Sequence, residues 1–134
     1  MKHGNGIEYN NEGKILFKGE YKNNEKWNGK VYIYNVDKIL IFEGEYINGK
    51  KKGIYLEYDE YNRLKFKGEY LNGKRNGKGR EYYHNGVLKF EGEYLDGERN
   101  GKGYDYDEKG KLISDGIYIN GLLINPETKR CILI

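Results

Sequence analysis

The residues that could carry out acid–base chemistry in this sequence are mainly carboxylates, and they recur in two registers. One register holds Glu20, Glu45, Glu69 and Glu93, and the other holds Glu8, Glu57, Glu81 and Asp105. A pair of carboxylates can hydrolyse a glycosidic bond. However, an enzyme needs one unique constellation, whereas these residues return from unit to unit of a repeat. We therefore interpret both registers as structural.

The histidines and the cysteine do not supply a metal site or a nucleophilic triad. His3 and His84 occupy non-equivalent positions, Cys131 is the single cysteine, and no cluster of such residues accompanies them in the sequence. We interpret both histidines as surface turn residues. The GKG segments resemble phosphate loops, but no GxxxxGK[ST] motif enters a helix. We predict a protein that is not an enzyme and that has no metal or cofactor.

Composition favours one small ordered domain. The chain has 134 residues, of which 34% are charged and 37% hydrophobic, with 15 Tyr and 20 Gly. The net charge is only +3, which argues against a nucleic-acid partner. A lone cysteine demands no oxidising compartment, and neither a signal peptide nor a stretch of about 20 apolar residues is present. We expect a cytoplasmic protein.

An internal repeat organises the chain. The phrase Phe-x-Gly-Glu-Tyr starts at four positions separated by 25, 24 and 24 residues, and it uses every Phe of the protein. A degenerate copy follows at Ser114–Tyr118. The repeated structural positions are Phe17, Gly19, Tyr21, Phe42, Gly44, Tyr46, Phe66, Gly68, Tyr70, Phe90, Gly92 and Tyr94.

Each repeat is predicted to be a β-hairpin. A second phrase ends at Tyr9, Tyr34, Tyr58, Tyr82 and Tyr106. Both phrases alternate with the two-residue period of a strand, and Asn-Gly or Asp-Gly pairs suit the tight turns between them. Glycines that recur on one strand face indicate a curved sheet in which neighbouring aromatic rings cover them. The predicted fold is all-β: an elongated, curved, single antiparallel sheet of about five 24-residue hairpins over residues 1–121.

The repeated phrases resemble the MORN (membrane occupation and recognition nexus) repeat. The likeness rests on Phe-x-Gly-Glu-Tyr, then Asn/Asp-Gly-Lys, then Asn-Gly-Lys-Gly, and it covers nearly the whole chain. The eight-residue step from Tyr82 to Phe90 is most similar to the variant found in toxin–antitoxin system antitoxin-component proteins. The resemblance implies an array of hairpins that serves as an accessory or scaffold part rather than as a catalyst.

Residues 122–134 depart from the repeat, and two interpretations remain open. They form either a capping hairpin or tail over the last repeat, or a C-terminal C-a-a-X prenylation box at Cys131 with Lys129-Arg130 upstream.

The leading functional hypothesis is a protein–protein interaction or scaffold module that presents aromatic side chains. An antitoxin or immunity protein that masks a toxin is the alternative, and phospholipid or carbohydrate binding is less favoured. Self-association through a sheet edge or the apolar tail is a further option. The candidate partner surface comprises Trp27, Tyr32, Tyr34, Tyr55, Tyr58, Tyr82, Tyr104 and Tyr106.

The residue after each Phe alternates in sign along the repeats: Lys18, Glu43, Lys67 and Glu91. We expect these side chains to meet across the intervening strand and to help set the repeat register. On this basis, reversing the charge of Lys67 alone should slightly lower the melting temperature.

Overall fold

The computed structural model describes residues 2–124 and the backbone of 131–132, and all of its regular elements are strands. The strands are β1 (Gly4–Tyr9), β2 (Ile15–Lys22), β3 (Glu25–Tyr34), β4 (Leu40–Ile47), β5 (Lys50–Tyr58), β6 (Leu64–Leu71), β7 (Lys74–Tyr82), β8 (Leu88–Leu95), β9 (Glu98–Tyr106), β10 (Leu112–Ile119), β11 (Leu122–Ile124) and β12 (Cys131–Ile132). Within the described residues, no helix is long and apolar enough to cross a membrane.

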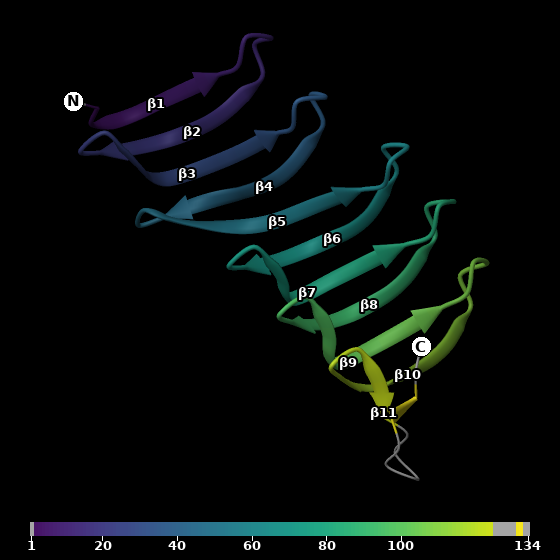
Figure 1. The fold of residues 1–134 in the computed structure, drawn as a ribbon. Coiled ribbons are helices and arrows are strands. Elements are labelled where there is room, and N and C mark those ends of the chain that lie inside the picture. The colour runs from purple at the N-terminus through teal and green to yellow at the C-terminus, as the bar shows by residue number, and fades with distance from the viewer. Residues whose placement is uncertain (1, 125–130, 133–134) are drawn as a thin grey trace. The chain divides into compact units, whose positions relative to one another are not determined.

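The chain forms two compact units, residues 1–55 and 56–134, and the division falls within β5. In the first unit β1 to β5 pair in chain order, and every pairing is antiparallel. In the second unit β6 to β12 do the same. Figure 1 shows this succession of hairpins. The predicted all-β fold of consecutive antiparallel hairpins is therefore confirmed.

The short turns form where the sequence predicts them. Asn48 and Asn72 adopt positive φ angles of 50° and 52°, and each is followed by a glycine with a φ of 80°. Asparagine and glycine are the residues that tolerate this left-handed conformation, so the Asn-Gly pairs close the hairpins.

Paired glycines mark one face of each unit. Gly68 lies directly opposite Gly79, and Gly92 lies opposite Gly103. A Cβ atom at Gly79 would lie 2.6 Å from Cζ of Phe66 and 2.9 Å from Cε2 of Tyr94, so these rings occupy the space above the glycine. Aromatic rings thus cover glycines of this face, as predicted, with Phe42 over Gly44 and Gly53 and Phe90 over Gly92 and Gly103. The pair Gly19 and Gly29 is an exception, because the atoms nearest to their missing Cβ atoms all belong to the backbone. We call this side of each unit the phenylalanine face and the opposite side the charged face.

Each unit has its own small aromatic core on the phenylalanine face. The first core contains Phe17, Tyr21, Val31 and Phe42, and the second contains Phe66, Phe90, Tyr94 and Tyr118. Edge-to-face contacts recur, with ring centroids 5.2 Å apart for both Phe66–Tyr94 and Phe90–Tyr118. Such pairs stabilise the fold beyond the burial of their area.

At the C-terminal end, β11 pairs with β10 and the backbone of β12 pairs with β11. The side chain of Cys131 and residues 133–134 lie outside the described residues. The choice between a cap and a prenylation box at Cys131, together with the domain boundary at residue 121, therefore stays a prediction.

Candidate functional site

The carboxylates of the second register each bind a tyrosine hydroxyl and a cation. Glu81 Oε2 accepts a hydrogen bond of 2.5 Å from the Tyr94 hydroxyl and another of 3.0 Å from Arg99 Nε. The Arg99 guanidinium also lies over the Phe90 ring, with Cζ 3.9 Å from the centroid. We call such a group of tyrosine, carboxylate and cation a carboxylate triad.

The triad recurs at Glu57, which accepts from the Tyr70 hydroxyl and from Arg75, whose Nε lies 2.9 Å from Oε2. It recurs again at Glu8, which accepts from the Tyr21 hydroxyl and lies 3.6 Å from Lys26 Nζ.

Asp105 is a variant of the same arrangement. It accepts from the Tyr118 hydroxyl and lies 3.1 Å from Arg99 Nη1, so Arg99 serves two carboxylates. The second register is thus engaged in packing each hairpin against the next.

These contacts shift the ionisation of the groups involved. Burial acts to raise the pKa of Glu81, but hydrogen bonds from Arg99 and Tyr94 outweigh it and hold that pKa below the ordinary 4.5. The pKa of Glu57 is lowered in the same way by Arg75 and Tyr70 against the effect of burial. Burial and the Glu57 carboxylate together raise the pKa of Tyr70 to about 12. Glu57 and Glu81 are therefore ionised and Tyr70 is neutral at neutral pH.

The first register is also structural in the second unit. Glu69 Oε2 accepts a 2.6 Å hydrogen bond from the Lys78 backbone N–H, and Glu93 Oε2 accepts one of 2.7 Å from the Lys102 N–H. His84 lies in an exposed turn with its Nδ1 atom 3.3 Å from Asp59 Oδ2. In the part of the chain that the structure describes, no group of three or more His, Cys, Asp or Glu residues could hold a metal ion.

The first unit interrupts the triads at one copy. Glu8 and Glu81 lie opposite Phe17 and Phe90, but the residue opposite Phe42 on β3 is Ile33. An isoleucine thus stands where the other copies have a carboxylate. Val31 stands where Gly79 does, is only 5% exposed and lies opposite Phe17. The interruption therefore replaces a polar contact with aliphatic surface.

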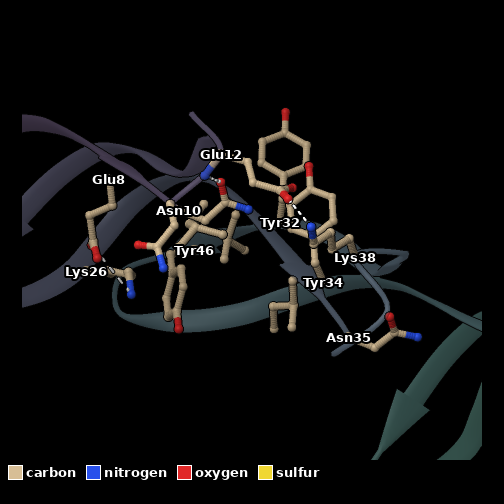
Figure 2. A pocket seen from close by; sticks show the side chains of 13 residues that line it. Glu8, Asn10, Glu12, Lys26, Tyr32, Tyr34, Asn35, Lys38 and Tyr46 are labelled. Atoms are coloured by element: carbon tan, nitrogen blue, oxygen red, sulfur yellow. Dashed lines mark hydrogen bonds and ion pairs between the residues drawn. The ribbon is translucent and has the colours of Figure 1, made fainter. Parts of the chain in front are cut away.

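An open groove of about 690 Å³ lies at this interruption (Figure 2). Val31, Ile33 and Leu16 are its aliphatic lining residues, and Tyr32, Tyr34 and Tyr46 are its aromatic ones. Tyr32 lies opposite Glu43 and thus on the other face of β3 from Val31 and Ile33, so the groove takes residues from both faces of the strand. Two ion pairs, Glu8–Lys26 and Glu12–Lys38, are part of the lining. We call it the first-unit groove. Its size is that of a site for a small molecule or for a few side chains of a partner.

The structure brings together only part of the predicted aromatic surface. Tyr32 and Tyr34 share the first-unit groove. Tyr55 lies instead on the phenylalanine face, with its ring centroid 4.5 Å from that of Phe42. Trp27 packs near the Asn48-Gly49 turn, since a Cβ at Gly49 would lie 3.1 Å from its ring.

The other candidates are partly buried at or near the ends of strands in the second unit: Tyr58 on β5, Tyr82 on β7, and Tyr104 and Tyr106 on β9. None of these placements tests partner binding, so the surface as a whole stays a prediction.

Sequence reasoning missed Ile33, Tyr46 and Lys26 as groove residues. The signal was present, because the second register of carboxylates skips one repeat at Ile33. Recognising its meaning required knowing that the carboxylate binds a tyrosine 13 residues later, as Glu81 binds Tyr94.

These features define a protein built of repeated β-hairpins with an aromatic and glycine-rich face. The MORN repeat model matches residues 42–54, 66–87 and 90–104, so these three segments are MORN repeats. A comparison with curated proteins found no match.

Proposed function

We propose that the protein is a non-catalytic protein-interaction or scaffold module that binds its partner through the first-unit groove. MORN repeats are commonly protein- or membrane-interaction modules. The observation that carries the proposal is the groove, where Tyr32, Tyr34 and Tyr46 line open space beside aliphatic side chains. Aromatic residues in such a setting provide large contact area at low entropic cost.

The same geometry argues against catalysis by the repeated carboxylates. Glu57 and Glu81 are each held by a tyrosine and an arginine, and Glu69 and Glu93 by backbone N–H groups. A general acid or base must be able to exchange a proton with a substrate, and these carboxylates are engaged in fold contacts instead.

The test is affinity capture of a partner by the tagged protein, followed by a binding titration with the captured partner. Changing both Tyr32→Ala and Tyr34→Ala should weaken binding about thirtyfold, as expected when an aromatic anchor worth roughly 2 kcal/mol is removed. Tyr61→Ala is the matched control, because Tyr61 is 70% exposed in a turn outside the groove. Unchanged binding by the double variant would contradict the proposal.

An antitoxin or immunity role is a special case of partner binding, and the similarity of the Tyr82–Phe90 step to antitoxin-component proteins favours it. Co-expression with a toxin encoded beside the gene should rescue growth if this is correct, and the Tyr32→Ala/Tyr34→Ala variant should lose the rescue. We propose a cytoplasmic location for either role, which cell fractionation would check. Flotation with liposomes, with and without anionic lipid, tests the less favoured membrane alternative.

A further inference from the structure

The carboxylate triads show what the interrupted copy lacks. In the triads of Glu8, Glu57 and Glu81, one carboxylate receives both a tyrosine hydroxyl and a cation. The tyrosine follows the carboxylate by 13 residues and the cation follows it by 18. The intact triads therefore show that a tyrosine and a cation at these positions bind a carboxylate.

In the interrupted copy, the tyrosine and the cation are present and the carboxylate is not. Tyr46 and Lys51 lie directly opposite each other on β4 and β5, and Ile33 stands at the carboxylate position. Lys51 is exposed, with Nζ 4.9 Å from the centroid of the Phe42 ring. Within the described residues, no carboxylate lies within ion-pair distance of Lys51 and no acceptor binds the Tyr46 hydroxyl.

The distribution of charge between the two units also favours an acidic ligand. Residues 1–55 contain 10 Lys and no Arg against 7 Asp and Glu, a net charge of +3, whereas residues 56–134 contain 14 of each sign. The whole net charge of the chain thus belongs to the unit with the interrupted triad. A net positive charge on this unit favours the approach of an acidic partner.

We propose that Tyr46 and Lys51 bind an aspartate or glutamate side chain of a protein partner, which completes the interrupted triad. This inference rests on the proposed function and identifies the chemistry of the partner. The incoming carboxylate accepts from the Tyr46 hydroxyl and pairs with the Lys51 ammonium, as Glu81 does with Tyr94 and Arg99. Ile33 and Val31, which line the same groove as Tyr46, make its surroundings less polar and so strengthen the contact.

Lysine can pair with a carboxylate of the chain itself, as Lys26 does with Glu8, and it also suits one that arrives from another molecule. Its ammonium is a compact charge on a flexible stem, whereas arginine forms planar two-point contacts that need a fixed geometry. The second unit uses Arg75 and Arg99 for its internal carboxylates, and the interrupted copy has Lys51.

The probe for the test is a hexaglutamate peptide, titrated into the isotope-labelled protein at low ionic strength and followed by NMR. We expect shifts that centre on Tyr46 and Lys51. Lys51→Gln should weaken the binding about tenfold, the effect of losing one charge-assisted hydrogen bond. Lys52→Gln is the matched control, because Lys52 lies on the charged face opposite Glu45 and the substitution removes the same charge.

Ile33→Glu gives a second, independent variant, because it restores the internal carboxylate. It should weaken hexaglutamate binding about as much as Lys51→Gln does while raising the melting temperature, a combination that general damage to the fold would not produce. Equal weakening by Lys51→Gln and Lys52→Gln, or full binding by Ile33→Glu, would overturn the proposal.

Phosphatidylglycerol vesicles distinguish a membrane from an acidic protein. If vesicles bind through Lys51 and hexaglutamate does not, the occupant is a lipid surface and the proposal is wrong. Partner capture that needs Tyr32 and Tyr34 but not Lys51 would overturn this inference alone. Unchanged partner binding by the Tyr32→Ala/Tyr34→Ala variant would contradict the proposed function, and hexaglutamate binding that still depends on Lys51 would then show that the carboxylate site exists without that role.

Discussion

At the scale of single residues, the glycines of the phenylalanine face are fixed by the rings that cover them. Gly79→Ala would place a methyl group 2.6 Å from Phe66 Cζ and 2.9 Å from Tyr94 Cε2, and both rings belong to a packed core. We expect a loss of roughly 1–3 kcal/mol in the free energy of unfolding, measured by chemical denaturation, because a filled core resists added volume.

The control for this substitution is Gly73→Ala. Gly73 has a φ of 80° but nothing within 4 Å of its missing Cβ, so only backbone strain of about 1 kcal/mol is expected there. If Gly79→Ala is no more destabilising than Gly73→Ala, the rings do not constrain the glycine face.

The carboxylate triads make stability depend on acid pH. The folded-state pKa of Glu57 and that of Glu81 lie below the ordinary 4.5, so their stabilisation is complete above that value and is lost as the pH falls through the folded value. Burial raises the pKa of Asp105, so its contribution has the opposite sign and offsets part of the effect. We expect the urea midpoint to fall between about pH 5 and pH 3.

Glu81→Gln isolates this effect. It should lower stability at neutral pH, because Arg99 loses one of its two carboxylates, and it should also make the pH dependence shallower. An unchanged slope in this variant would show that other groups govern acid unfolding.

At the scale of strands, the observed register differs from the expectation that the charged residues after each Phe meet across the intervening strand. Lys67 lies directly opposite Arg80, and the Glu91 carboxylate pairs with that arginine at 2.7 Å. Glu91 therefore pairs with the intervening strand instead of reaching across it to Lys67. Lys67→Glu should raise stability by about 0.5 kcal/mol at low salt, since it replaces a like-charge pair with an opposite one.

Thermal unfolding of Lys67→Glu at two salt concentrations checks this. The gain should shrink at about 1 M salt, where charges on the surface are screened within roughly 3 Å. A lower melting temperature at low salt would instead support the original expectation.

The strands and the glycine face could be predicted because they depend on short-range pattern. Two-residue alternation and Asn-Gly pairs report local conformation, so Phe66, Gly68 and the Asn72-Gly73 turn were all placed correctly. The triads could not be predicted, because they depend on which side chains meet across strands after a β-bulge has shifted the register. The role of Ile33 can be recognised only from the tyrosine hydroxyls that bind the equivalent residues Glu57 and Glu81.

At the scale of the whole molecule, repeats that contact mainly their neighbours need not be equally stable. The second unit has arginine triads at Glu57 and Glu81 and a further pair at Asp105, whereas among the described residues of the first unit the one triad is that of Glu8 with the more distant Lys26. We expect backbone amides of β7 to β9 to exchange hydrogen more slowly than those of β3 and β4, about tenfold for each 1.4 kcal/mol of difference in the free energy of local opening.

Ile33→Glu should slow exchange in β3 and β4 and leave β7 to β9 unchanged. Exchange at one common rate in both units, before and after the substitution, would mean that the chain opens as a single cooperative body and that the interrupted triad has no local effect.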